Sequence, residues 1–227
     1  MITSIFDQFL SPVLMGISLT TVATLSPAML IVVSNNRWNK TRMLATQGWF
    51  FTRFIKEVAT PLSTAGQKWT LLFMALLICL MSLNLLGLLP YTFTPTTQLS
   101  LNLAMALPLW ITTIYAGLRH APKDMIAHVL PQGTPNALIP MLILVETMSL
   151  LIRPIALAMR ITANLTAGHL LMHLISAGIF FLMSALPPVA LITSLALAAL
   201  TVLEMLVGVL QAYVFVLLLS MYLKEAL

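Results

Sequence analysis

The residues of this sequence that could do chemistry are ionisable groups placed inside long apolar runs, accompanied by two amides. They are Glu146, Arg153, Arg160, His169, His173 and Glu204, with the amides Asn164 and Gln211. An ionisable group inside hydrocarbon is costly, and proton relays are one of the functions that justify it. Histidine and glutamate exchange protons readily, whereas arginine keeps its proton in a protein. The pattern therefore predicts an ion pathway that contains a permanent cation.

The composition shows which kind of element must position these groups. Of the 227 residues, 60% are hydrophobic and only 7% are charged, whereas soluble domains have about 25% charged residues. Most of the chain must therefore face lipid, and the fold class is an all-α membrane protein. The net charge of +5 does not indicate nucleic-acid binding, because the basic residues flank apolar spans. The single cysteine, Cys79, excludes a disulfide within the chain.

The apolar runs divide one membrane domain, residues 1–227, into about five embedded helices. The two C-terminal runs are each about 40 residues long, or roughly 60 Å as helices, which is twice the hydrocarbon thickness. Such helices must be broken or strongly tilted, and we expect tilt. The expected elements are a first span at 10–33, an amphipathic inner-side segment at 37–68, spans at 69–89 and 99–118, an inner loop at 119–135, and a long tilted antiparallel hairpin at 136–223.

Within the hairpin, the polar residues form stripes that one register brings together. On a helix, Glu146, Arg153, Arg160 and Asn164 fall within about 40° of one another, while His169 lies roughly opposite Arg160. Glu204 and Gln211 share a stripe on the last helix, together with Gly208. If the turn lies near Leu186, Arg160 faces Gln211 and Glu204 faces His169. That single register predicts both pairs.

Charges in the loops predict the orientation of the chain. The segment at 37–68 holds six lysine and arginine residues against Glu57, and the loop at 119–135 has Arg119 and Lys123 against Asp124, whereas the loop near 90–98 has no charge. The positive-inside rule then places the amino terminus outside and, after five crossings, the carboxyl terminus inside.

The basic segment is also expected to form an interfacial helix. At 100° per residue, Leu44, Phe54, Ile55 and Val58 share a face with Phe51. The opposite face holds Thr46, Arg53, Lys56 and Glu57, and the expected interfacial anchors are Trp38 and Trp49.

Structural explanations exist for several of the polar residues. Arg153, directly before Pro154, fits a snorkelling arginine, and His173 fits a packing residue as well as a functional one. Asn164 and Gln211 would serve to join helices by hydrogen bonds, worth about 1 kcal/mol each in bilayers, and the same explanation covers Asn84 and Asn102. Arg160 differs, because no acidic residue lies one turn away on its helix. Its countercharge is expected to come from outside that helix.

Three runs of sequence resemble a known family. The run ETMSLLIRPIALAMRITANLTAGHLLMHLI at 146–175 resembles the signature of subunit a of F-type ATP synthases in its mitochondrial form. The runs LLGLLPYTFTPTTQLSLNLAMALPLW at 85–110 and ALTVLEMLVGVLQAYVFVLL near the carboxyl end are similar to the same subunit. The resemblance implies a proton-conducting stator that couples proton flow to rotation of a c-ring and to ATP synthesis.

The resemblance also implies roles for individual residues. Arg160 matches the stator arginine that faces a carboxylate on each ring helix. His169 and Glu204 match the half-channel open to the intermembrane space, and Glu146 matches the one open to the matrix. The residues that the resemblance assigns to proton translocation or its support are Arg160, His169, Glu204, Glu146, Asn164, Gln211 and His173. No cofactor or metal is implied.

The implied partners are the ring of subunit c, other membrane-sector and peripheral-stalk subunits, and lipid, without nucleic acid. The implied location is the mitochondrial inner membrane, with the amino terminus in the intermembrane space and the carboxyl terminus in the matrix. No phosphate-binding glycine-rich loop occurs in the sequence, so the chain is not expected to be an enzyme by itself. Two alternatives stay open: a secondary transporter, for which inverted repeats would be expected, and a purely structural membrane subunit.

Overall fold

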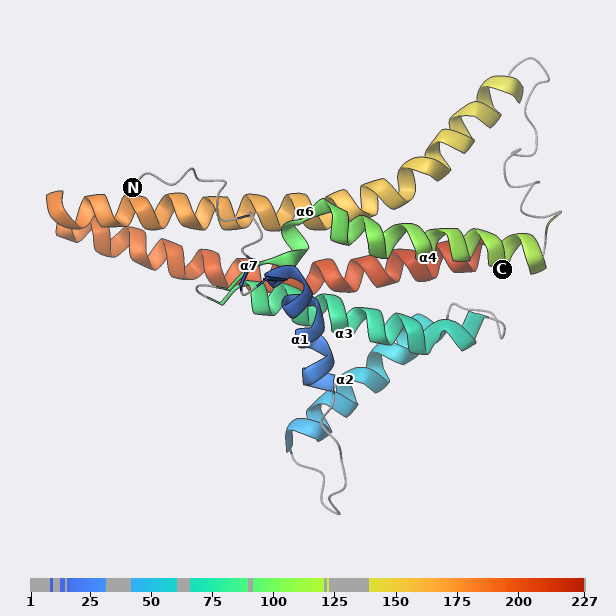
Figure 1. Cartoon of the computed structure of the whole chain (residues 1–227), viewed down its shortest axis with the longest axis horizontal. Helices are drawn as coiled ribbons and strands as arrows, with labels where there is room; N and C mark the ends of the chain where they lie inside the picture. The colour runs from blue at the N-terminus through green and yellow to red at the C-terminus, as the bar shows by residue number, and fades with distance from the viewer. Residues whose placement is uncertain are drawn as a thin grey trace. The chain divides into compact units, whose positions relative to one another are not determined.

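The computed structural model describes residues 9, 13–14, 16–31, 42–60, 66–89, 92–120, 122 and 139–226, and almost all of these lie in helices. Figure 1 shows their order along the chain. The elements are β1 (Val13–Leu14), β2 (Ile17–Ser18), α1 (Leu19–Ile31), α2 (Arg42–Ala59), η2 (Gly66–Trp69), α3 (Thr70–Gly87), η3 (Pro95–Thr97), α4 (Leu99–His120), α6 (Ile139–Ala185) and α7 (Pro187–Ala226).

Four helices of the described residues are long and apolar enough to cross a membrane. They are Gly66–Gly87, Leu99–Arg119, Ile139–Ala185 and Pro187–Glu225. A helix needs about 20 residues to cross the hydrocarbon core, so each of them is sufficient. The predicted class, an all-α membrane protein with long C-terminal helices, is confirmed.

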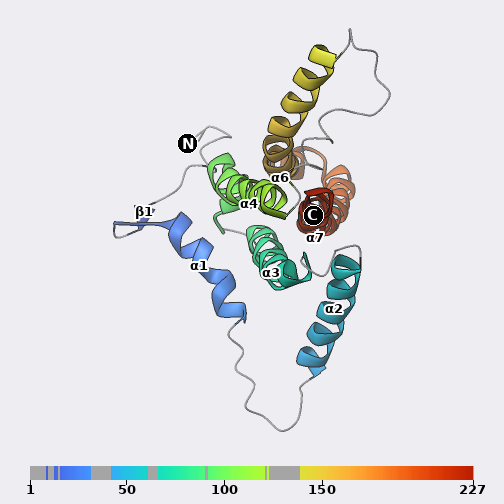
Figure 2. The same cartoon turned by 90° about the vertical axis from the view of Figure 1, so that its right-hand side faces the viewer.

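The first predicted span differs from the structure. The strands Val13–Leu14 and Ile17–Ser18 pair antiparallel, Val13 with Ser18 and Leu14 with Ile17. Gly16 adopts a φ of 83° in the turn, a conformation that glycine tolerates best. The helix α1 that follows (Figure 2) has 13 residues and contains Pro27, so at 1.5 Å per residue it measures only about 20 Å. The remaining residues of the 10–33 range lie outside the described part of the chain.

The two long C-terminal helices are continuous. α6 has 47 residues and α7 has 40, and only Leu186 separates them, where the predicted register placed the turn. Pro187 begins α7, a position where a missing N–H costs nothing. Pro154 lies inside α6 without ending it. These helices are therefore not broken as one alternative required, and their tilt in a bilayer stays a prediction.

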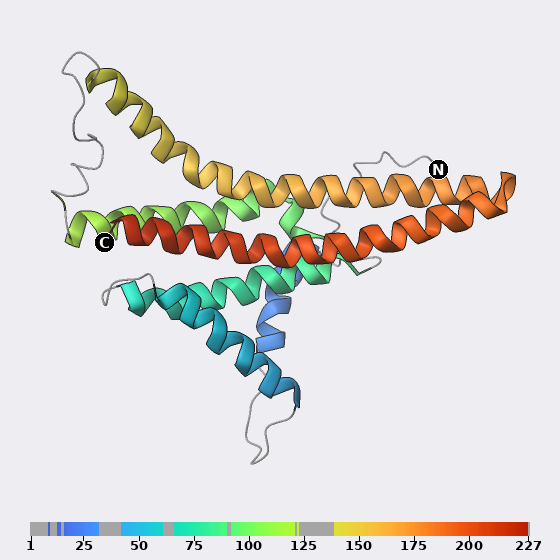
Figure 3. The same cartoon turned by 180° about the vertical axis from the view of Figure 1, so that it is seen from behind.

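Two compact units make up the chain, and each contains parts of both long helices. Unit 1 comprises 1–33, 78–102 and 159–213, and unit 2 comprises 34–77, 103–158 and 214–227. In unit 1, the last part of α6 and the first part of α7 run antiparallel on either side of the turn (Figure 3). The buried apolar residues of unit 1 include Leu80, Leu83, Ile161, Leu165, Ala190 and Ala212.

Unit 2 contains the amphipathic helix α2, which the sequence predicted in part correctly. Phe54 and Val58 are buried, with exposed fractions of 3% and 4%, but Ile55 is exposed to 39%. Arg53 lies on the exposed side, with its guanidinium carbon 5.6 Å from the centroid of the Trp49 ring. Tryptophan and arginine on the outer side of such a helix suit a membrane interface. Trp38 and the Leu44 side chain lie outside what the structure describes.

Candidate functional site

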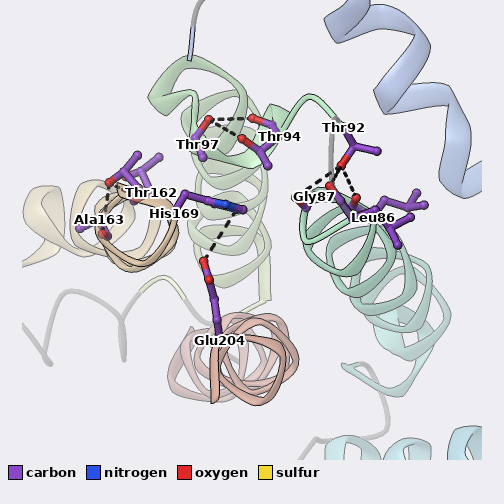
Figure 4. Close-up of polar contacts among 11 residues, drawn as sticks. Leu86, Gly87, Thr92, Thr94, Thr97, Thr162, Ala163, His169 and Glu204 are labelled. Carbon is purple, nitrogen blue, oxygen red and sulfur yellow. Dashed lines mark hydrogen bonds and ion pairs between the residues drawn. The ribbon is translucent and has the colours of Figure 1, made fainter. Parts of the chain in front are cut away.

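The centre of unit 1 holds a histidine and a glutamate from the two arms of the hairpin. His169 Nε2 lies 3.8 Å from Glu204 Oε1, and the exposed fractions of the two side chains are 13% and 4%. Figure 4 shows the imidazole of α6 and the carboxylate of α7 pointing toward each other. The predicted register thus brings this pair together. Two groups that both exchange protons therefore lie close together in a buried part of unit 1.

Gly168 provides the space that the Glu204 carboxylate occupies. A Cβ atom built on Gly168 would lie 2.6 Å from Glu204 Oε1 and 2.9 Å from Glu204 Cδ. Those distances are far below van der Waals contact, so any side chain at 168 would displace the carboxylate. The glycine next to His169 therefore has a steric function at this site.

Asn84 ties α3 to the same stretch of α7. Its Nδ2 donates a hydrogen bond of 2.9 Å to the backbone carbonyl of Gly208, which is one helical turn beyond Glu204. A Cβ on Gly208 would stand 3.5 Å from Asn84 Cβ, so the two helices approach closely there. The sequence had grouped Asn84 with residues that merely join helices, and its proximity to Glu204 was not predicted.

Several buried oxygens in unit 1 have no hydrogen-bond partner among the described residues. They are Asn84 Oδ1, Asn102 Oδ1 and both carboxylate oxygens of Glu204. Buried polar atoms are nearly always satisfied, and where protein groups do not serve, water does. The interior around Glu204 therefore has the chemistry of a hydrated path.

A turn rich in threonine precedes α4 and adds further polar groups to unit 1. Thr94, Thr96 and Thr97 are buried. The hydroxyls of Thr94 and Thr97 lie 3.2 Å apart (Figure 4), and Asn102 Nδ2 donates a 2.8 Å hydrogen bond to the carbonyl of Thr96. This turn was not singled out from the sequence, since threonines in a loop carry no distinctive spacing.

Arg160 lies on an exposed face of α6 in unit 1. Within the described part of the chain no hydrogen bond or ion pair is recorded for its guanidinium. Ala163, Asn164 and Ala167 are also exposed, one to two turns further along. Small residues let another helix approach closely. The predicted need for a countercharge from outside this helix is consistent with that arrangement.

Gln211 forms a hydrogen bond with Asn164. Its Oε1 accepts a 3.2 Å hydrogen bond from Nδ2 of Asn164, which follows Arg160 by one turn. The predicted proximity of Arg160 to Gln211 stays a prediction. His173, one turn beyond His169, has an exposed side chain, which argues against the packing explanation.

In unit 2, Arg153 joins α6 to the end of α7. Its Nη1 donates a 2.8 Å hydrogen bond to Glu225 Oε2, and its Nη2 lies 3.9 Å from Glu146 Oε1. Its Cζ is 5.1 Å from the centroid of the Tyr222 ring. The interpretation of Arg153 as a snorkelling arginine was wrong, because the side chain is paired within the protein.

The chain is similar in sequence to known proteins along nearly its whole length. The family model described as the ATP synthase A chain matches residues 14–224. Two proteins called ATP synthase F(0) complex subunit a, from Scyliorhinus canicula and Salmo salar, are 56% and 53% identical over 225 residues, covering 99% of each chain. The one from Latimeria chalumnae is 56% identical over 220 residues and 97% of each chain. The chain therefore belongs to the ATP synthase A chain family, the subunit a of F-type ATP synthases.

Proposed function

We propose that the polar residues of the two long helices form two proton half-channels separated by Arg160. As a member of its family, the chain is the proton-translocating stator subunit of the ATP synthase membrane sector. It is a multi-pass membrane protein that assembles with the c-ring and other subunits, and the catalytic sites lie on other chains. The assignment of individual residues to the path is the proposal.

The first half-channel contains His169 and Glu204 and opens to the outer side. The observation that carries it is the buried Glu204 carboxylate, 3.8 Å from His169 and without a hydrogen-bond partner among the described residues. A buried acid that packs against a glycine and faces a histidine is suited to receive a proton through water and pass it on. Asn84, by its bond to Gly208, fixes the helix that bears the acid.

Arg160 separates this half-channel from the second one. Its positive charge is permanent, and its side chain is exposed with small neighbours, so a ring helix that carries a carboxylate has room to approach. Opposite charges in a low-dielectric environment attract strongly and keep the passing carboxylate ionised. The same cation repels protons, which blocks a direct leak between the two half-channels. Asn164, which binds Gln211 at 3.2 Å, supports the helix pair next to the arginine.

The second half-channel contains Glu146 and opens to the inner side. Glu146 is partly exposed, at 37%, and lies in the amino-terminal part of α6. This part follows the loop that the positive-inside rule places inside. A carboxylate there can take the proton from the ring and release it to the inner solution. Each elementary charge that crosses the membrane releases about 2.3 kcal/mol per 100 mV, which gives the rotor its direction.

The location that fits this arrangement is the mitochondrial inner membrane. The amino terminus would lie in the intermembrane space and the carboxyl terminus in the matrix. If each of the four described membrane-length helices crosses the membrane once, the segment before α3 and the carboxyl end lie on the same side, and the basic residues support the inner side. The segment that contains α1 would make the remaining crossing. Lipid is the expected neighbour of the exposed apolar faces.

The two half-channels can be tested by finding the side of the membrane from which positions 146 and 204 are accessible. In a complex in which Cys79 is replaced by serine, Glu146→Cys and Glu204→Cys would each be labelled with a small membrane-impermeant thiol reagent added to one side at a time. We expect labelling at 204 from the outer side only and at 146 from the inner side only. The Cys79→Ser complex without a new cysteine is the control for background. Labelling of both positions from the same side would refute the arrangement.

A further inference from the structure

The contacts of Arg153 extend from α6 to the last turn of α7. Two carboxylates and one aromatic ring surround its guanidinium. Nη1 binds Glu225 at 2.8 Å, and the ring of Tyr222 lies 5.1 Å from Cζ. Glu225 and Tyr222 are three residues apart, so they share one face of α7. Together they fix both the position and the plane of the guanidinium.

The other terminal nitrogen of this guanidinium, Nη2, is directed toward Glu146. Glu146 Oε1 lies 3.9 Å from Nη2, a distance at which the two charges attract without a short hydrogen bond. Glu146 and Arg153 are two turns apart on α6. A flexible arginine at that spacing can adopt many rotamers, so its approach to Glu146 depends on the two residues of α7.

We propose that Arg153 is a positioning residue for proton release, held beside Glu146 by Glu225 and Tyr222 of the carboxyl-terminal turn. The inference rests on the proposed role of Glu146 in the inner half-channel. It adds a function for the last turn of α7, because this turn holds the charge of Arg153 next to the Glu146 carboxylate.

The electrostatic consequence concerns the orientation of the Glu146 carboxylate. Among the described residues, the charged group recorded beside Glu146 is Arg153 on its own helix, and Arg153 in turn is paired with Glu225 of α7. At about 4 Å the guanidinium attracts the Glu146 carboxylate and so orients it. If Glu225 is lost, Arg153 is no longer held in one place, and if Arg153 is lost, the cation is gone.

The test is the dependence of coupled ATP synthesis on the pH of the inner side. In inverted inner-membrane vesicles the bathing solution meets that side, and the complex is kept whole. Arg153→Gln should displace the half-maximal point of synthesis from its wild-type pH, because the charge that orients Glu146 is gone. Arg153→Lys, which keeps the charge, should restore most of the wild-type profile. Because the catalytic head is the same in every variant, only differences between variants count.

A charge reversal separates positioning from simple cross-linking of the helices. The double variant Arg153→Glu with Glu225→Arg can still pair α6 with α7, but it presents a carboxylate where Glu146 had a cation. If Arg153 acts on Glu146, the reversed pair keeps the complex assembled and still leaves the pH profile shifted. A wild-type profile for the reversed pair would overturn the inference. The matched control is Lys224→Gln, which removes a charge from the same turn and should leave the profile unchanged.

Failure of this inference can be told apart from failure of the proposed half-channel. If Glu146→Gln lowers synthesis sharply while Arg153→Gln keeps the wild-type pH profile, only the role of Arg153 is wrong. If Glu146→Gln itself has no effect, the inner half-channel is misassigned and the inference falls with it.

Discussion

The Glu204 carboxylate occupies the space that the missing side chain of Gly168 leaves open, since a Cβ on Gly168 would lie 2.6 Å from Glu204 Oε1. The residue next to this glycine, His169, is the one that faces the acid at 3.8 Å. A single turn of α6 thus supplies both the room and the proton-exchanging neighbour for the acid of α7. The position of the Glu204 carboxylate therefore depends on the absence of a side chain at Gly168.

Gly168→Ala is therefore expected to impair proton flow by displacing Glu204. Alanine raises helix propensity by about 1 kcal/mol over glycine, so the helix and the assembled complex should persist. We expect proton-driven synthesis to fall about tenfold, which corresponds to about 1.4 kcal/mol on a barrier. The measurement is ATP synthesis in vesicles that contain matched amounts of complex.

Gly178→Ala is the control on the same helix, because a Cβ there meets nothing within 4 Å. It makes the same change in helix propensity without touching the acid. Equal rates for Gly168→Ala and Gly178→Ala would mean that the contact with Glu204 has no functional weight.

Asn84→Leu should lower proton flux, since it removes the bond to Gly208 and one unsatisfied oxygen near Glu204. Loss of one such hydrogen bond costs about 1 kcal/mol, which assembled complex should tolerate. The matched control is Ser82→Ala on the same helix, because among the described residues the bond recorded for the Ser82 hydroxyl is to the carbonyl of Cys79 within its own turn, at 2.9 Å. Proton uptake into vesicles distinguishes the two. The assignment of Asn84 to the path fails if both variants conduct equally well.

His169 and Glu204 should behave as one unit in a double-mutant cycle. Glu204→Gln keeps the shape of the side chain but cannot carry a proton, and His169→Gln removes the other exchanging group. If protons pass along the pair, each single variant should lose most of the synthesis rate, and the double variant should be little worse than either. Additive losses, measured as rates of ATP synthesis, would show that the two residues act independently.

The sequence predicted the hairpin well because its polar residues are few and regularly spaced. One register placed His169 against Glu204 and the turn at Leu186, and both are found. At Gln211 the recorded hydrogen bond comes from Asn164, one turn beyond Arg160, and the predicted proximity of Arg160 stays a prediction. The spacing of residues indicates which helix faces meet, but the reach of each side chain decides which two residues form a hydrogen bond.

Other features depended on contacts that spacing cannot show. Arg153 and Glu225 are 72 positions apart in the sequence, and both lie far from the turn of the hairpin. Asn84 recognises a backbone carbonyl, and every residue offers one. The first segment was predicted as a helical span from its hydropathy, but Gly16 permits a turn at a positive φ, and the helix begins only at Leu19.

Arg160 is proposed as the fixed charge that a rotor carboxylate must meet. Arg160→Ala removes this charge but keeps the helix. Because no partner of the guanidinium is recorded in the described chain, few contacts within the subunit are lost. Arg160→Lys keeps a positive charge but loses the planar fork, and a buried lysine can deprotonate. We expect both variants to assemble and both to fail in coupled synthesis.

The most direct measurement compares ATP synthesis with passive proton conduction in vesicles that carry matched amounts of assembled Arg160→Ala complex. We predict that coupled synthesis is abolished and that passive conduction persists or rises, because the barrier between the half-channels has gone. Near-normal coupled synthesis by the Arg160→Ala complex would contradict the account.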